Sequence, residues 1–143
     1  KDLDLLKGVL KKSILNNLPR TMPAFSLAKT LSKRASSVGF DWNDNEGVLK
    51  KIYEELNELE EAMLISPEAM KEELGDVLFT LVNFSRRIGV DPEQALSMAC
   101  EKFISRFNGM EKMTLADGIK LTDLSSAEFE LLWQQQKNKA PNF

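Results

Sequence analysis

Four acids are the residues of this chain best suited to chemistry, and they fall into two pairs, Glu55 with Glu58 and Glu73 with Asp76. In each pair the acids are spaced i, i+3, so on a helix their carboxylates would lie roughly 60° apart around the axis. Between the pairs, Ser66 followed by Pro67 is typical of a helix start, with serine as the N-cap and proline in the first turn. Two helices joined by so short a turn must run antiparallel.

Counting from Ser66 predicts that the two acid pairs face each other. Glu58 lies eight residues before Ser66 and Glu73 lies seven after it, and the helical rise then puts both roughly 10–12 Å from the turn. Glu55 and Asp76 both come out roughly 15–17 Å from the turn by the same rise. Four carboxylates that converge in this way repel one another unless a cation lies between them. The spacing therefore predicts a metal site between two antiparallel helices.

The residue types restrict which metal this site would take. Ligands that are all oxygen favour a hard cation, Mg²⁺ with Mn²⁺ as a possible substitute. The chain has no histidine, which excludes Ser-His and Cys-His triads and zinc sites built on histidine. A single helical glutamate is usually only a solubilising surface residue, and we expect this of Glu54 and Glu61. Two pairs at matched depth favour the metal site over that interpretation.

The acid pairs also belong to a pattern that resembles a known family. Glu54–Glu58 reads EExxE and Glu73–Asp76 reads ExxD, and this combination resembles the all-α nucleoside triphosphate pyrophosphohydrolases of the MazG family. Five segments resemble the second, C-terminal MazG repeat in order: Leu18–Ala24, Val38–Trp42, Glu73–Phe79, Lys102–Phe107 and Trp133–Lys137. The resemblance implies Mg²⁺-dependent attack on the α-phosphorus of a nucleoside triphosphate, giving the monophosphate and pyrophosphate. In that reading Glu55, Glu58, Glu73 and Asp76 are the catalytic metal ligands.

Three cations and two other side chains are candidates for substrate binding. Lys102 and Arg106 are spaced i, i+4 and share a helix face, as do Trp133 and Lys137. Spacing alone fits a solvated helix face equally well. The resemblance implies that Lys102 and Arg106 bind phosphates and that Trp133 lies near the nucleotide. It leaves open whether that nucleotide is ordinary, damaged or signalling. Asn83 follows Asp76 by two turns on the same helical side, and we expect it to orient a sugar or phosphate.

Helix signals recur along the chain and predict an all-α fold. Ala24 to Val38 follows Pro23 and ends at Gly39, Asn43 or Asp44 can cap a second helix, and a third ends at Arg86–Gly89. Asp91-Pro92 and the capping box that begins at Ser125 open two more helices. We expect an antiparallel hairpin with flanking helices, forming a four-helix bundle core that a second copy completes. Residues 1–20 are predicted to be an N-terminal helix or linker, and residues 21–143 the MazG-like domain.

Composition limits the partners of the protein. The chain of 143 residues has a net charge of −3, which argues against general nucleic-acid binding. No apolar run reaches membrane-spanning length, and no signal peptide is visible. The single cysteine, Cys100, fits a reducing cytoplasm and is predicted to be a buried apolar residue. The widely spread apolar residues of the first acid-bearing helix predict a homodimer.

Three hypotheses follow, from three classes of protein. The first is an active pyrophosphohydrolase that acts in nucleotide-pool control or removes unwanted nucleotides. The second is a catalytically silent MazG-like half that serves dimerisation or regulation, and the third is a helical adaptor whose acids only solvate it. The complete acid quartet, together with the cations and Trp133, favours the first. No residue predicts which base or sugar is preferred.

Overall fold

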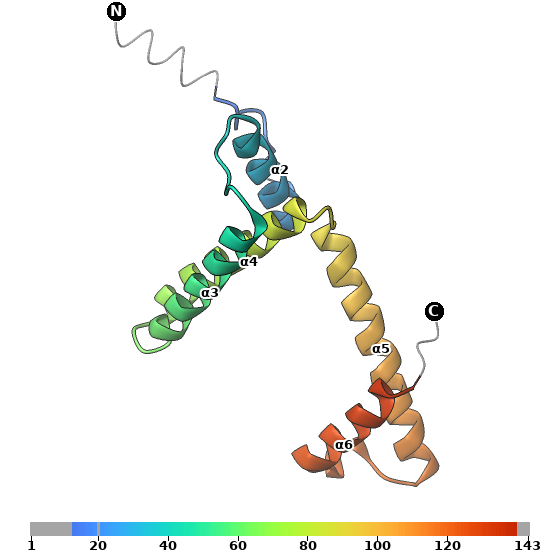
Figure 1. The fold of residues 1–143 in the computed structure, drawn as a ribbon. Helices are drawn as coiled ribbons and strands as arrows, with labels where there is room; N and C mark the ends of the chain where they lie inside the picture. The colour runs from blue at the N-terminus through green and yellow to red at the C-terminus, as the bar shows by residue number, and fades with distance from the viewer. Residues whose placement is uncertain (1–12, 20, 140–143) are drawn as a thin grey trace, which may run out of the picture. The chain divides into compact units, whose positions relative to one another are not determined.

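The computed structural model describes residues 13–19 and 21–139, and these form helices without any strand. In chain order the elements are α2 (Ala24–Ser37), α3 (Asn45–Ala62), α4 (Pro67–Arg87), α5 (Pro92–Ala116), the 3₁₀-helix η1 (Leu121–Asp123) and α6 (Ser126–Lys137), as Figure 1 shows. The all-α prediction is confirmed for this part of the chain. The predicted helix or linker over residues 1–20 falls largely outside the described residues. Its boundary with the predicted domain at 21–143 stays a prediction.

The predicted caps set the ends of the helices. The Asp44 carboxylate accepts a hydrogen bond from the Gly47 N–H at 2.7 Å, and the Ser66 hydroxyl accepts one from Ala69 at 3.1 Å. Ser125 opens α6 with the reciprocal capping box to Glu128 that the sequence predicts. Gly89 follows α4 with a φ of 73°, a left-handed conformation that a side chain would strain.

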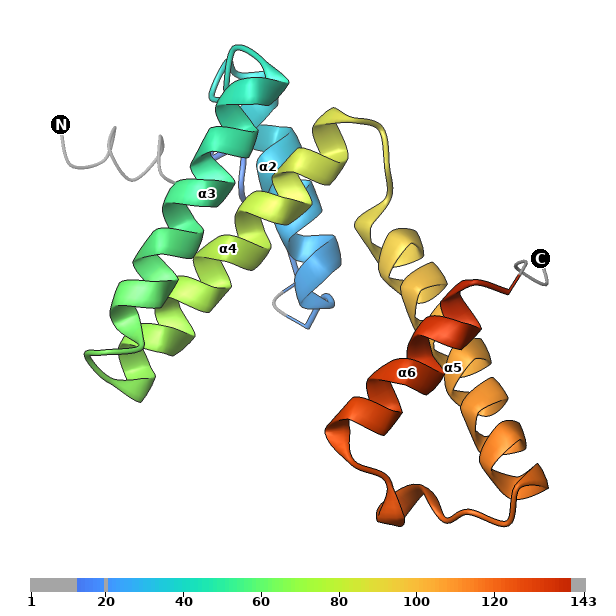
Figure 2. The same ribbon diagram turned by 60° about the horizontal axis from the view of Figure 1, so that its bottom comes forward.

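The chain divides into two compact units, Lys1–Gln94 and Ala95–Phe143. In the first unit α3 and α4 pack side by side as the predicted antiparallel hairpin, and α2 packs on α4 (Figures 1 and 2). Val48 and Ile52 of α3 and Val77 and Val82 of α4 are buried in this unit. These side chains fix the rotation of the two helices and thereby decide which residues face the gap between them. The four-helix bundle would need a further helix or a second copy.

Asp41, in the loop before α3, joins that loop to the end of α4. Its carboxylate accepts hydrogen bonds from Arg86 at 2.7 Å and from the Ser36 hydroxyl at 2.8 Å, and pairs with Arg87 at 2.9 Å. Arg86 also donates to Asn83 Oδ1 at 2.8 Å. We call Asp41, Asn83, Arg86 and Arg87 the Asp41 clamp. Burial raises the pKa of Asp41, but the hydrogen bonds from Arg86, Ser36, the Trp42 N–H and Arg87 outweigh it and hold the pKa well below its usual range.

The second unit contains most of α5, then η1 and α6. Met110 and Thr114 of α5 are buried, and so is Gln136 of α6. Cys100 is exposed, so the prediction that it is buried is wrong. The side chains around it on α5 are exposed as well, because that stretch of the helix has little packed against it among the described residues.

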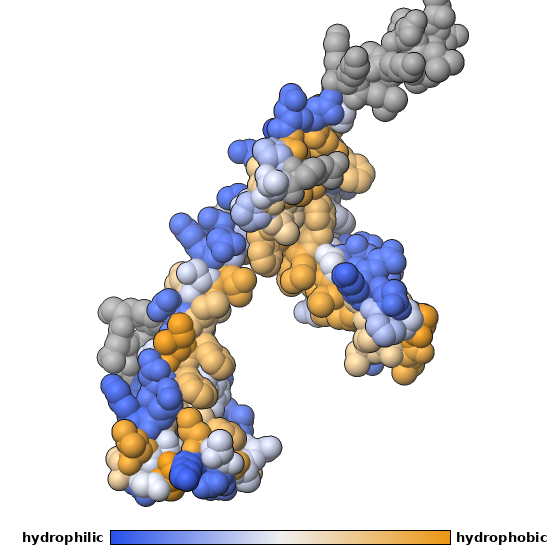
Figure 3. Space-filling model, turned by 180° about the vertical axis from the view of Figure 1, so that it is seen from behind, coloured by the Kyte–Doolittle hydropathy of each residue, from blue (hydrophilic) through white to orange (hydrophobic). Residues whose placement is uncertain are grey.

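Large apolar side chains remain exposed in both units, and Figure 3 shows hydrophobic surface over each of them. On the hairpin they form two stripes at helical spacing. One has Leu49, Tyr53 and Leu56 on α3 with Met63 directly after it, and the other has Leu74, Leu78 and Leu81 on α4 with Ile88 directly after it. An exposed apolar surface of this extent is typical of a protein that binds a partner. None of the described helices is both long and apolar enough to cross a membrane.

Candidate metal site and basic groove

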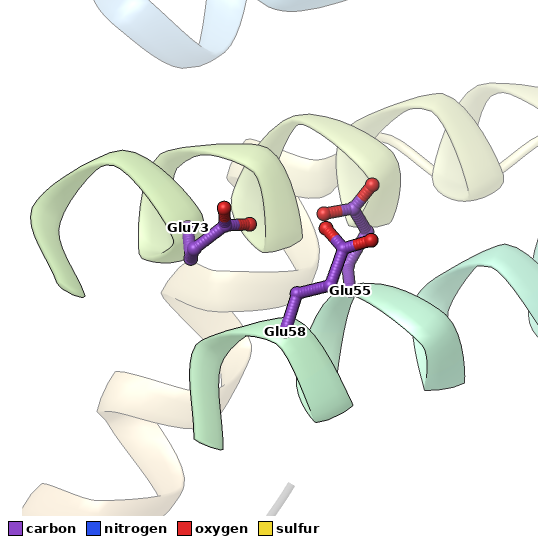
Figure 4. Close-up of side chains that lie close together, drawn as sticks. All are labelled: Glu55, Glu58 and Glu73. Carbon is purple, nitrogen blue, oxygen red and sulfur yellow. The ribbon is translucent and has the colours of Figure 1, made fainter. Parts of the chain in front are cut away.

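Three of the four predicted acids meet between α3 and α4. Glu55, Glu58 and Glu73 each offer a carboxylate oxygen, and these oxygens all lie within 4.8 Å of one another. Glu55 and Glu58 extend from α3 toward α4, and Glu73 extends from α4 (Figure 4). We call these three residues the acid cluster. Its geometry is what the matched distances from Ser66 predict for a hairpin with a short turn.

Packing of the hairpin positions the acid cluster. Glu55 lies on the same face of α3 as Val48, Ile52 and Ala62, and its side chain is buried with them. Glu73 is half-buried and Glu58 is exposed. The cluster therefore runs from the core of the hairpin to its surface, so that an ion at the buried end could still be reached from solvent.

Two oxygens of the acid cluster lack a hydrogen bond. Among the described residues, Glu55 Oε2 and Glu73 Oε2 are buried side-chain atoms without a hydrogen-bond partner. A buried polar atom without a partner costs free energy, and a buried carboxylate oxygen costs more. A divalent cation would satisfy both oxygens, so the residues present fit a hard metal ion.

One cation of the chain compensates part of this charge. Lys51 Nζ lies 3.0 Å from Glu55 Oε1 and 3.9 Å from Glu54 Oε2. The hydrogen bond to Glu55, together with the attraction of its charge, raises the pKa of Lys51. Lys51 reaches one oxygen of Glu55 and leaves the other without a partner. Lys51 was not among the predicted site residues, although its i, i+4 spacing before Glu55 indicates the pair.

The negative charges near Glu73 also affect the pKa of its carboxyl group. Burial raises the pKa of the Glu73 carboxyl, and the negative charges of Glu58, Asp76 and Glu55 raise it further. A raised carboxyl pKa means that the ionised form is disfavoured in the folded protein. A divalent cation would remove that penalty, because its charge favours the ionised form.

Two predicted site residues of α4 lie apart from the acid cluster. Asp76 is exposed and is not part of the group that meets within 4.8 Å, although its charge acts on Glu73 one turn before it. Asn83 is buried, and its Oδ1 accepts hydrogen bonds from Arg86 in the Asp41 clamp. A contact between Asn83 and a nucleotide would therefore have to use its amide nitrogen. The predicted roles of both residues stay predictions.

The predicted substrate cations line one groove of the second unit. Lys102, Arg106 and Lys137 lie along a groove with a volume of about 970 Å³ between parts of α5 and α6. Lys112 and Lys139 line it too, and Glu101 is the one acid among its lining residues. We call this the basic groove. Lys112 lies ten residues after Lys102 on α5, and Lys139 follows α6, so neither was predicted from the spacing of the other cations.

Trp133 joins α6 to α5 beside this groove. Its ring lies 5.3 Å from the Phe103 ring, centroid to centroid, and the Arg106 guanidinium carbon lies 5.5 Å from its centroid. A guanidinium over an aromatic face is attracted to it and held in place. Trp133 thus contacts one of the predicted phosphate-binding cations, while its role at a nucleotide stays a prediction.

Comparison with known proteins agrees with the family that the sequence motifs resemble. Residues 43–110 match the MazG nucleotide pyrophosphohydrolase domain. The chain is 44% identical over 131 residues to a protein of Thermotoga maritima named nucleoside triphosphate pyrophosphohydrolase/pyrophosphatase MazG, over 92% of this chain and 51% of that protein. It is 37% identical over 130 residues to the nucleoside triphosphate pyrophosphohydrolase of Escherichia coli K12, over 89% of this chain and 49% of that protein. The chain thus spans about half the length of these two relatives.

Proposed function

We propose that this chain belongs to the MazG family, whose domain matches residues 43–110, and that it is a Mg²⁺-dependent nucleoside triphosphate pyrophosphohydrolase. It would cleave a nucleoside triphosphate to the monophosphate and pyrophosphate. The names of the relatives in Thermotoga maritima and Escherichia coli support this activity.

The observation that carries the proposal is the meeting of three carboxylates with two buried oxygens that lack partners. Glu55, Glu58 and Glu73 would hold the metal ion, and Asp76 would join them from one turn further along α4. When bound, Mg²⁺ polarises phosphoryl oxygens and lowers the pKa of a water molecule. One of the carboxylates can accept the proton of the attacking water.

The basic groove would hold the phosphates. A bound triphosphate carries about four negative charges near neutral pH, and Lys102, Arg106 and Lys137 offer positive charge along one groove. The contact with Trp133 holds Arg106 in place for this task.

We further propose that the protein acts as a homodimer in the cytoplasm. The exposed stripes on α3 and α4 present Leu49, Leu56, Leu74 and Leu81 together on the hairpin. A second hairpin laid on these stripes would complete the predicted four-helix bundle and remove their apolar surface from water. The single cysteine fits a reducing compartment.

The test is an assay of pyrophosphate release from a panel of canonical, deoxy and modified nucleoside triphosphates, with and without Mg²⁺. The parent should release pyrophosphate only with the metal, and Glu58→Gln should lose the activity. Glu61→Gln serves as the matched control, because Glu61 is exposed on the same helix and lies outside the acid cluster.

Equal, slow release by the parent and by Glu58→Gln would contradict the proposal and favour the silent MazG-like half. The adaptor hypothesis would require, in addition, that neither Mg²⁺ nor Mn²⁺ raises the melting temperature.

A further inference from the structure

Gly109 of α5 and Gln136 of α6 lie against each other. A Cβ atom added to Gly109 would overlap Gln136 Oε1 and lie 2.6 Å from Gln136 Cδ. Glycine inside a helix is unfavourable compared with alanine, so a glycine here needs a reason. The reason is space, because only a residue without a side chain leaves room for the Gln136 amide.

A larger residue at position 109 would displace the Gln136 side chain from its present place. It is buried, with a relative exposure of 7%, and its Nε2 donates to Met113 Sδ at 2.9 Å. Moving the amide away from position 109 would break this contact. A side chain at position 109 would therefore disturb the contact that Gln136 makes between α6 and α5.

On α6, Gln136 lies between Trp133 and Lys137, two of the proposed substrate-binding residues. Lys137 is the next residue of α6, and Trp133 lies one turn before Gln136 and contacts Phe103 and Arg106. Gly109 and Gln136 also line the basic groove. The position of α6 at this contact therefore decides whether Lys137 lies on the same groove as Lys102 and Arg106.

We propose that the contact of Gln136 with Gly109 positions α6 on α5 and so assembles the phosphate-binding cations into one groove. Gln136 is thus a positioning residue, and Gly109 is the position that admits it. The expected consequence, phosphate binding in the basic groove, rests on the proposed function. The contact itself rests on the structure of the second unit alone.

The test is a double-mutant cycle with inorganic tripolyphosphate as the probe, in the absence of divalent metal, followed by calorimetry. Gly109→Ala should weaken binding about tenfold when Gln136 is present, because the added methyl collides with its amide. In a Gln136→Ala background the same change should weaken binding less than about twofold, since the collision partner is gone. Gln136→Ala alone should weaken binding by a smaller factor, because the groove loses its fixed geometry.

Gln135→Ala is the matched control for Gln136→Ala, because Gln135 is the exposed neighbour on α6. The same loss from Gly109→Ala in both backgrounds would overturn the proposal. If Gly109→Ala unfolds the chain, the double variant must restore folding for the proposal to stand.

Trp133 fluorescence in a Trp42→Phe background gives a second readout that needs no ligand. The emission should shift in Gly109→Ala and return in the double variant, and an emission that does not change in Gly109→Ala overturns the proposal. A parent that binds no tripolyphosphate would count against the proposed role of the basic groove in catalysis, while the emission would still decide the role of the contact.

Discussion

In the first unit, the Asp41 clamp and the acid cluster place carboxylates in opposite electrostatic surroundings. In the Asp41 clamp, one carboxylate faces two guanidinium groups at 2.7 and 2.9 Å and has a lowered pKa. In the acid cluster, three carboxylates lie close together, Lys51 pairs with Glu55 among the described residues, and the pKa of Glu73 is raised. Asp41 is satisfied by the protein itself, whereas the acid cluster leaves two oxygens without a partner. The difference separates an ionic contact that the protein completes by itself from one that, in the proposed function, a metal ion would complete.

The largest effect should come from neutralising a member of the acid cluster. Glu73→Gln should reduce pyrophosphate release by about 100-fold or more, because a metal ligand is lost. The melting temperature of the metal-free protein should stay the same or rise, since the change removes a charge that the fold disfavours. A clear loss of stability in the absence of metal would contradict the comparison. Steady-state assays and thermal melts of the same preparations measure both quantities.

Neutralising the clamp should have the opposite effect on stability. Asp41→Asn leaves Arg86 and Arg87 without their carboxylate and should reduce the free energy of unfolding by about 2 kcal/mol. That figure is set below the usual cost for a fully buried pair, because the Asp41 side chain keeps an exposure of 16%. Urea unfolding measures the loss. An unchanged midpoint would show that the clamp does not stabilise the unit.

The two groups should also give opposite responses to pH in the metal-free protein. The raised pKa of Glu73 means that stability should rise as the pH falls from neutral toward and through that pKa, because protonation removes the disfavoured charge. The lowered pKa of Asp41 contributes stability that is present above its ordinary value of 3.8 and is lost as the pH falls further. Unfolding curves at several pH values should therefore show a rise followed by a fall. Glu73→Gln should weaken the rise, and Asp41→Asn should weaken the fall.

The smallest effect on stability should come from replacing Lys51. Its side chain is 36% exposed, so Lys51→Gln should change the free energy of unfolding by less than about 1 kcal/mol. Because Glu55 then loses its one cationic neighbour, the stabilisation by added Mg²⁺ should become larger than in the parent. Melts with and without the metal test this, and a smaller metal effect in Lys51→Gln would argue that the ammonium helps to build the site.

The sequence predicted the features that depend on local geometry. The Ser66 cap and the short turn fix the register of α3 against α4, so counting residues is enough to bring Glu55, Glu58 and Glu73 together. The same count could not place Asp76, because the rotation of α4 is set by the packing of Val77 and Val82, and this leaves Asp76 exposed.

Features that join distant segments could not be predicted in this way. Arg86 and Arg87 lie where the sequence predicts the end of a helix, and they bind Asp41 in the distant loop before α3. The basic groove likewise depends on how α6 packs on α5, which no local spacing reveals. The exposure of Cys100 is also a tertiary property, since its position in an apolar stripe predicts burial only where something packs on that stripe.

The most direct test of the acid cluster as a metal site is the binding of Mn²⁺ by the protein without nucleotide, followed by electron paramagnetic resonance. The parent and Glu61→Gln should remove free Mn²⁺ from solution in a saturable manner, and Glu58→Gln and Glu73→Gln should lose most of that binding. Binding that is equally tight in all four proteins would contradict the assignment of the metal to Glu55, Glu58 and Glu73.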